Sequence, residues 1–344
     1  MAYAAKIHNV IGNLAKEEAV SGVAESLSTS ADAIQPWFTD RSGIPVSMSY
    51  LYEGRLGPAP GVEGMLRPVA PLGGAVQWEM PFFFKGGGAA YSSSVFPLLH
   101  RYWKASGHTA VLDATGGAEK WTYTPTAVGT APTTLTNELY TDGEKIPVIG
   151  VHGNWKFSGD TSSLLKHTFS LQGIKGTIAD SAPTVPGAFT YSLLSVVPPS
   201  PMGSTLLIGS YLSAIGVKSV DWDSGRMLEA RPGLDAADAH LGFTHRGREP
   251  KLTVVVEATA FVGTPFHTSA GLDPYELYEA SNSFACSFQH AGAQYNRFKL
   301  VVNQATLVEP PAQERVGGVS CWRLVIGPYC STPIANDDYN ILVN

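Results

Sequence analysis

The chain has 344 residues, more than the roughly 100 to 200 of a typical single domain, so two domains are expected. Only 15% of the residues are charged and the formal net charge is −6, which excludes an overall positive field that would attract nucleic acid. The first residues lack the continuous apolar core of a signal peptide, and no later apolar stretch suits a membrane span of about 20 residues. A soluble protein made in a cytoplasm is therefore expected.

The first half of the sequence predicts a short helix and then a long hairpin. Apolar residues from Val95 to Trp103 recur at helical spacing, with Ser94 as the candidate N-cap and Gly107 just beyond the end. Apolar and polar residues then alternate through VIGVHGNWKFSG and, after a turn at 159–162, through LLKHTFSLQ. These two segments predict a β-hairpin with one apolar and one polar face.

A proline-rich segment separates the two halves. Five prolines lie between Ala182 and Ser204, which disfavours both a helix and a central strand. The predicted modules are therefore residues 1–190, which include an N-terminal arm, and residues 191–344, joined by a packed crossover. With abundant Thr, Ser, Gly and Pro, the predicted fold class is mainly β (α+β).

The second half repeats the order of strand, helix and strands. KLTVVVEATAF alternates like a strand, and ACSFQH and RFKLVVNQATL follow as further strands. Between them Pro274 suits the first position of a helix, with Asp273 as its cap and Glu276 completing a capping box. Glu79 and Glu257 lie at similar distances ahead of the two helices. The halves are interpreted as diverged duplicates, and the alternative that any two such modules look alike stays open.

No sequence motif predicts a catalytic, cofactor or metal site. The nine histidines show neither HExxH nor HxH spacing, and GxSxG is absent. The run from Lys85 to Gly88 lacks the GK[ST] ending of a phosphate loop. Asp221 and Asp223 resemble the start of a calcium loop, but Pro232 stands where a bidentate Glu is needed, so an Asp-Ser-Gly hairpin turn is preferred. A structural or binding role, not an enzyme, is expected.

Two further groups of residues are assigned structural roles. The basic cluster at 246–251 is interrupted by Glu249, so it predicts salt bridges in preference to a phosphate contact. The cysteines Cys286, Cys321 and Cys330 are expected to be reduced and mostly buried. A disulfide between the last two stays open, because the sequence does not give their separation.

Several short motifs follow one another along most of the chain. LAKEEAVSGVAESLSTSADAI opens with Lys-Glu, a Gly and Asp-Ala-Ile, and PLLHRYWKASGHT reads as a short helix ending in Gly. KWTYTPT and TLTNELYTDGEKIPVIGVHGNWKFSGDTSSLLKHTFSLQGI contain a Tyr-Thr-Pro strand, an Asp-Gly turn, a Gly-x-x-Gly-Asn segment and a closing Gly173. VKSVDWDSGRM and GFTHRGREPKLTVVVEA come last, with Arg248 and Pro250 entering a strand. In this order the motifs resemble tail tube proteins of long-tailed bacteriophages, especially those with two tube modules in one chain, although Ser21 replaces a frequent aromatic.

The resemblance implies two tandem β-sandwich or half-barrel modules, each with one helix, in a structural protein of the phage virion. Subunits are expected to close into rings that stack into a tube for DNA ejection, their hairpins forming a continuous lumen barrel. Homotrimeric, pseudo-hexameric rings are favoured, with hexamers as the alternative. The implied partners are further copies of the chain and the tape measure, tail terminator and baseplate proteins. DNA passes without specific binding, and no cofactor or membrane is implied.

The polar face of the first hairpin is the expected lumen lining. Alternation places these candidate residues on it: His152, Asn154, Lys156, Lys166, Thr168 and Ser170. An electronegative lumen is expected, because rows of Lys and Arg would hold DNA. A competing hypothesis is a β-sandwich decoration or host-carbohydrate-binding module of the virion, which shares the strand content and predicts an exposed aromatic platform.

Overall fold

A computed structural model describes residues 9–10, 12–34, 44–54, 57–58, 65–66, 69–127, 130–141, 144–177, 179–180, 193, 195–209, 211–212, 216–232, 240–258, 274–279, 281, 283–332 and 335–344. Over these residues the fold is mainly β, as predicted, with the short helices α1 (His100–Ala105) and α2 (Pro274–Glu279). The strands before residue 190 are β1 (Asn9–Val10), β2 (Gly12–Glu17), β3 (Ile44–Gly54), β4 (Gly57–Pro58), β5 (Met65–Leu66), β6 (Val69–Phe83), β7 (His108–Asp113), β8 (Lys120–Pro125), β9 (Leu135–Thr141), β10 (Glu144–Asp160), β11 (Lys166–Lys175) and β12 (Ala179–Asp180). Those after it are β13 (Thr205–Ile208), β14 (Tyr211–Leu212), β15 (Val217–Asp223), β16 (Arg226–Pro232), β17 (His240–Arg248), β18 (Lys251–Glu257), β19 (Phe284–Gln289), β20 (Phe298–Leu307), β21 (Ala312–Val316), β22 (Val319–Pro328) and β23 (Asn340–Val343).

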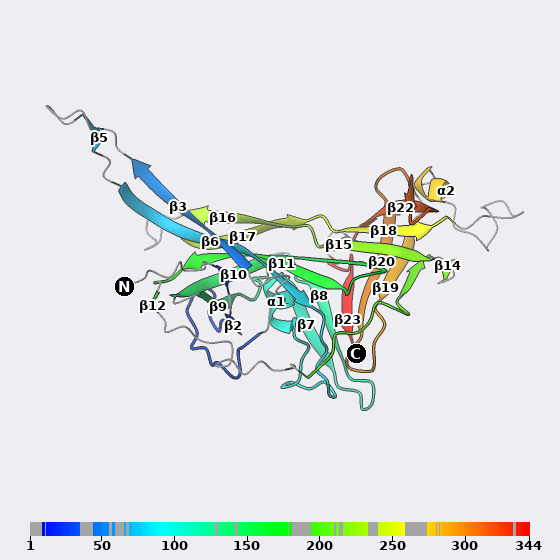
Figure 1. The fold of residues 1–344 in the computed structure, drawn as a ribbon, viewed down its shortest axis with the longest axis horizontal. Coiled ribbons are helices and arrows are strands. Elements are labelled where there is room, and N and C mark those ends of the chain that lie inside the picture. The colour runs from blue at the N-terminus through cyan, green and yellow to red at the C-terminus, as the bar shows by residue number, and fades with distance from the viewer. Residues whose placement is uncertain are drawn as a thin grey trace, which may run out of the picture.

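One long antiparallel sheet crosses both halves of the chain (Figure 1). Its strands pair in the order β3-β6-β11-β10-β15-β18-β22-β21, and we call this the long sheet. The halves meet where β10 pairs with β15, from Lys156 opposite Asp223 to Asp160 opposite Ser219. Main-chain hydrogen bonds therefore join the first half directly to the second.

Helix α1 covers the apolar face of the long sheet and is buried with it in an aromatic core. The ring of Tyr102 lies 4.9 Å from that of Phe82 on β6, and the ring of Trp103 lies 6.0 Å from that of Trp155 on β10. On the opposite side Phe298 of β20 stacks on Trp103. Large aromatic side chains bury much apolar area and pack in tilted and edge-on pairs. The buried apolar residues of both halves belong to one continuous cluster, so the halves share a core.

A second group of strands lies across this core from the long sheet. It pairs in the order β13-β19-β20-β23-β8-β7. The C-terminal strand β23 thus lies between β20 of the second half and β8 of the first, with Ile341 opposite Tyr123. The two halves are joined by strand pairing in both groups of strands.

Helix α1 begins later than predicted and ends where predicted. It starts at His100 without a side-chain cap, and Ser94, the predicted N-cap, hydrogen-bonds Ser92 in the preceding turn. Its end at Gly107 is confirmed, because this glycine has φ +77°, the left-handed conformation that ends many helices.

The second helix and the crossover lie at the edge of the described residues. Helix α2 begins at Pro274, as predicted, whereas Asp273 and the side chain of Glu276 lie outside the described part of the chain. The module boundary at residue 190 also lies outside it. Just beyond, Leu193 packs against the core and its carbonyl accepts a hydrogen bond from Lys85 Nζ at 3.3 Å, as a packed crossover requires.

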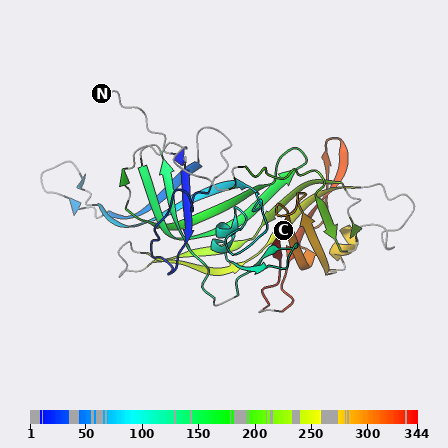
Figure 2. The same ribbon diagram turned by 90° about the horizontal axis from the view of Figure 1, so that it is seen from below.

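The Asp-Ser-Gly segment does not form the predicted hairpin turn. β15 and β16 follow one another and pair with β18 and β17, so together they make one long hairpin with a bend. At the bend Gly225 has φ +61°, and a Cβ there would lie 1.9 Å from the carbonyl oxygen of Glu249. Only glycine permits this approach of two backbones. The outer hairpins β3–β6 and β16–β17 extend toward the same end of the molecule (Figure 2).

Stability should fall below about pH 6.5, because buried histidines, His108 and His167 among them, are held neutral. His108 donates from Nδ1 to the Trp103 carbonyl and accepts from the Tyr339 hydroxyl, both at 2.8 Å, and burial lowers its pKa to about 3. His167 accepts from Trp155 Nε1 at 3.1 Å, and burial lowers its pKa well below the usual value. Unfolded histidines bind protons from about pH 6.5 downward and these do not, so each should remove about 1.4 kcal/mol from the free energy of unfolding per pH unit.

Urea unfolding between about pH 7.5 and pH 5 measures this dependence. The variant His108→Asn should reduce its slope by about one proton, whatever the variant's stability at neutral pH. A free energy of unfolding that stays constant across this range would contradict the prediction.

Candidate functional site

The polar face predicted for the first hairpin is present and points away from the core. The β10–β11 register sets Asn154 opposite Ser170 and Lys156 opposite Thr168, and Lys166 lies opposite Ser158 on the same face. The intervening residues Trp155, Phe157 and Phe169 are buried. Five of the six candidate lining residues therefore share one accessible face: Asn154, Lys156, Lys166, Thr168 and Ser170. That this face lines a lumen stays a prediction.

His152 is the exception and corrects the predicted set. Its side chain is only 6% exposed, because the ring of Phe243 on β17 lies edge-on to it at 6.2 Å. Burial, together with the charges of Arg226 and His245, lowers the pKa of His152 to about 3. Local alternation cannot reveal this cover, since hairpin β16–β17 comes from the other half of the chain.

The same face continues onto strands of the second half that were not among the predicted residues. Asp223 of β15 accepts hydrogen bonds from Asn154 Nδ2 at 2.8 Å and pairs with Lys156 at 3.0 Å. Asp221, Lys251, Thr253 and Arg323 extend the polar face across β15, β18 and β22. The alternation of VDWD and KLTVVVE carries the signal for this face, but only the strand order places it beside the first hairpin.

Acidic and basic side chains alternate across this face, which differs from the expected electronegative surface. Burial and the neighbouring Asp160 raise the pKa of Asp221, which Arg323 opposes. Burial alone would also raise the pKa of Asp223, but hydrogen bonds from Asn154, Gly225 and Lys156 lower it overall. Opposite charges on adjacent strands attract one another. The face as described is thus close to charge balance.

At the two ends of the long sheet, β3 and β21 each leave an edge open in the described part of the chain, while the last residues of β22, beyond β21, pair with β20. β3 pairs with β6, and its other edge meets only the two-residue strand β1 at Pro45 and Ile44. β21 pairs with β22 alone, and four of its five residues are exposed. Open strand edges present unpaired N–H and C=O groups that can pair with another chain. An edge with unpaired main-chain donors and acceptors therefore lies at each end of the long sheet.

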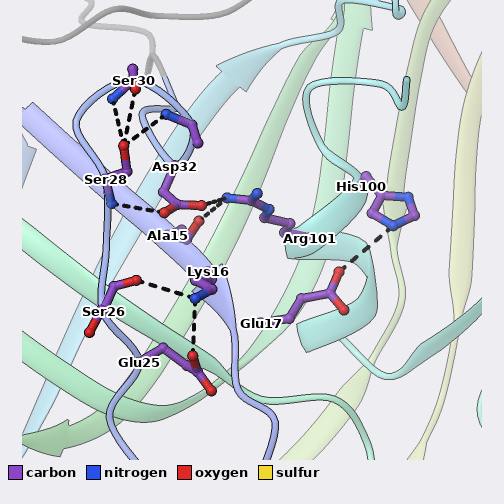
Figure 3. Close-up of polar contacts among 11 residues, drawn as sticks. Ala15, Lys16, Glu17, Glu25, Ser26, Ser28, Ser30, Asp32, His100 and Arg101 are labelled. Atoms are coloured by element: carbon purple, nitrogen blue, oxygen red, sulfur yellow. Dashed lines mark hydrogen bonds and ion pairs between the residues drawn. The ribbon is translucent and has the colours of Figure 1, made fainter. Parts of the chain in front are cut away.

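The N-terminal segment is fastened to helix α1 by ion pairs (Figure 3). Arg101 of the helix pairs with Asp32 at 2.8 Å and also donates to the Ala15 carbonyl, while Asp32 accepts from the Ser28 amide. Lys16 pairs with Glu25 at 3.0 Å within the segment itself. The charged residues of the family-like opening motif therefore act as structural anchors.

A buried carboxylate fixes the same segment to β9 and β10. Glu18 accepts hydrogen bonds from the amides of Gly22 and Gly150, at 2.6 and 2.8 Å, and from the hydroxyls of Thr134 and Thr136. Four donors satisfy a carboxylate that is only 9% exposed. Gly22 has φ +78°, so the motif's glycine is explained by the turn it makes over Glu18.

The other groups singled out in the sequence have structural contacts. In the basic cluster, Arg248 makes a two-pronged contact with Asp338 at 2.7 and 2.8 Å, and Arg246 pairs with Glu229, which confirms salt bridges. In the glycine run, Gly86 donates to Asn296, and a Cβ at this position would lie 1.8 Å from the Tyr295 carbonyl oxygen. The three cysteines are free, and two are buried.

Within the described residues no group of three metal-ligating side chains is gathered, and none of their helices has the length and apolar character to cross a membrane. The chemical resources of the polar face are thus hydrogen bonds and paired charges. Its geometry is that of a wide sheet face with alternating side chains and an open strand edge at each end.

Removing the arginine of the N-terminal anchor should loosen the segment. Arg101→Gln leaves Asp32, 5% exposed, without its cation, and should lower the free energy of unfolding by about 2 to 4 kcal/mol. Amide exchange over residues 12–34 should become faster. The control Lys120→Gln breaks the exposed pair with Asp113 and should cost less than about 1 kcal/mol. Equal effects of the two variants in urea unfolding would refute the anchor.

The sequence was compared with protein-family models and with curated proteins. Neither comparison finds a match. The function is therefore inferred from the geometry of the chain itself.

Proposed function

We propose that this chain is a structural, self-assembling subunit whose copies close into rings and stack into a tube, the tail tube of a long-tailed bacteriophage. The observation that carries the proposal is the long sheet, which has one buried face, one polar face and an open edge at each end. An enzyme needs a site that gathers reactive groups, whereas an assembly subunit needs complementary edges. The described long sheet, with an open edge at each end, fits the second requirement.

A repeated strand pattern supports two tandem modules. The first half contributes β3-β6-β11-β10 to the long sheet and the second contributes β15-β18-β22-β21. In each set a first hairpin, β3–β6 or β15–β18, is followed by a helix and then by a second hairpin, β10–β11 or β21–β22. The later strand of the second hairpin pairs with the later strand of the first. This shared order, which includes a reversal of the second hairpin, is more specific than strand content alone. It favours duplication of one sandwich-like module with one helix.

The junction inside the chain supplies a template for the junction between chains. β10, the last strand of the first set, pairs with β15, the first strand of the second. In the same scheme β21 of one copy would pair with β3 of the next. This contact joins different surfaces of the two copies, and repeating it gives a ring when the rotation closes.

The number of strands favours three copies per ring over six. Three copies of eight strands make a barrel of 24 strands, which at about 4.8 Å per strand has a diameter of roughly 37 Å before strand tilt widens it. Six copies would double this diameter. The smaller barrel already accommodates a DNA duplex, so the homotrimeric, pseudo-hexameric ring is the preferred assembly.

The polar face would line the lumen of this tube. Its basic side chains are matched by acidic ones, as in the pair Lys156–Asp223, so DNA would meet no continuous row of cations. Tape measure, tail terminator and baseplate proteins are the further partners of such a tube, and the virion is its location. Passage without specific binding thus rests on charge balance instead of a negative surface.

Electron microscopy and light scattering at rising protein concentration test the proposal. Rings with the mass of three 36.5 kDa chains, and filaments of constant width, are the expected result. Persistent monomers that bind glycans would instead support the decoration or carbohydrate-binding module. Rings with the mass of six chains would keep the tube and reject the trimer.

Blocking the β21 edge should stop assembly and leave the fold intact. Gly317 and Gly318 make the two-residue turn of the β21–β22 hairpin, both with positive φ, so Val316 and Val319 form its first hydrogen-bonded pair. The amide of Arg315 then points outward, away from β22. Arg315→Pro removes this donor without breaking a β21–β22 hydrogen bond.

The matched control is Arg315→Gln, which removes the same charge and keeps the amide. Light scattering should show rings for the control and monomers for Arg315→Pro, with circular dichroism unchanged in both. Ring formation by the proline variant would refute β21 as the assembly edge.

A further inference from the structure

A partly open cavity of about 760 Å³ lies beside the point where β10 passes from one half to the other. Its wall is built by the residues after helix α1, by β10, by hairpin β16–β17 and by residues 328–330, 336, 338 and 339. This volume exceeds the needs of a few trapped waters and falls in the range of small-molecule sites. It is separate from the polar face, and an inference about it does not depend on ring assembly.

The cavity wall carries excess positive charge. Asp338 is the one carboxylate among its described lining residues. Four arginines line it: Arg226, Arg231, Arg246 and Arg248. Asp338 is engaged by Arg248, and Arg246 pairs with Glu229. For the other two arginines no carboxylate of the described chain lies within ion-pair distance. Within the described residues these two guanidinium groups therefore have no carboxylate as a counter-charge.

Arg226 is the more unusual of these two, because its side chain is only 9% exposed. One terminal nitrogen donates to the Ala105 carbonyl at the end of α1 at 2.7 Å, and more weakly to the Gly153 carbonyl at 3.4 Å. Its Nε is buried without a partner. Gly107 makes room for the group, since a Cβ there would lie 2.7 Å from its Cζ. Burying a guanidinium with only carbonyl partners is costly and leaves its charge uncompensated.

Two more buried polar atoms without a hydrogen-bond partner belong to residues that line the same cavity. The hydroxyl of Ser106, next to the helix end, and Nδ1 of His152 on β10 are both buried without a hydrogen-bond partner. Buried polar groups in folded proteins nearly always have partners. Three such atoms from three elements, Arg226 Nε, Ser106 Oγ and His152 Nδ1, around one positively charged cavity indicate a ligand that accepts hydrogen bonds.

We propose that this cavity binds an oxyanion, a carboxylate or a tetrahedral sulfate- or phosphate-type group, held by Arg226 with Ser106 and His152 as further donors, while Arg231 adds positive charge to the wall. A guanidinium fork matches the spacing of two oxygens on such a group, which a spherical anion does not offer. The oxyanion has two sources, a free ion or an acidic side chain of a second copy. Both place the same chemistry in the cavity.

Calorimetric titration of the full-length chain with sodium sulfate tests the site, against sodium chloride at matched ionic strength. Saturable binding of sulfate is expected, and Arg226→Lys should weaken it about tenfold by removing the fork. Arg231→Gln should weaken it roughly threefold; this arginine is exposed, so the variant is expected to fold even when Arg226→Lys does not. Ser106→Ala should weaken it by a smaller factor.

The control Arg323→Gln removes an exposed arginine of the polar face and should leave sulfate affinity unchanged. Light scattering in sulfate distinguishes the sources: a higher concentration needed for assembly identifies an acidic side chain of a second copy, and unchanged assembly identifies a free ion. No saturable sulfate binding beyond chloride, or binding that neither Arg231→Gln nor Ser106→Ala alters, would overturn the proposal.

Discussion

Along one of its edges the 17-residue strand β10 changes partner from β9 to β15, and the arrangement of the long sheet follows from that change. Its first part pairs with β9, ending where Val151 lies opposite Leu135, and its last part pairs with β15, starting at Lys156. Between them Ser224 bridges the gap, since its amide donates to the Trp155 carbonyl at 2.9 Å and its hydroxyl accepts from the Trp155 amide. Strand β10 therefore joins β9 of the first half to β15 of the second half in a fixed register.

The change of partner also explains the buried arginine. A strand that leaves one neighbour before it meets the next exposes main-chain carbonyls, and Gly153 presents its carbonyl to the Arg226 guanidinium. The carbonyl of Ala105, at the end of α1, is the second acceptor. The bend at Gly225, one residue earlier, turns the chain so that this side chain reaches the end of α1. Bend, gap and cavity are thus consequences of joining two strand sets edge to edge.

Local patterns in the sequence predicted what local forces decide. Alternation through β10 and β11 correctly separated Trp155 and Phe169 from Lys156 and Thr168, because a half-buried strand has a period of two. The end of α1 at Gly107 was also correct, because a glycine in the left-handed conformation ends many helices. The burial of His152 was missed because Phe243 of β17, about ninety residues later in the chain, covers it. A contact between residues so far apart cannot be read from the local alternation of apolar and polar residues.

The failed hairpin turn has a similar cause. Asp-Ser-Gly is a sound turn sequence, and Gly225 does take a left-handed conformation. What the sequence does not contain is the length of the hairpin, which continues for seven residues in β16 because β17 supplies a partner there. The anchor residues show the complementary limit: Glu18 and Asp32 lie within the opening motif, but donors to them include Thr136 of β9, Gly150 of β10 and Arg101 of α1.

In the proposed ring the β21 edge pairs with β3 of the next copy and needs protection from other strands. β21 has five residues, carries the charged Glu314 and Arg315, and is bounded by Pro310 and Pro311 on one side and by a glycine turn on the other. Short, charged, proline-flanked edges discourage unspecific strand addition. Main-chain hydrogen bonds from so short a strand would supply little specificity, so a ring contact at β21 requires further contacts outside the edge itself. Hairpin β3–β6, which extends past the other strands at one end of the molecule (Figure 1), is the element of this fold with the reach to provide them.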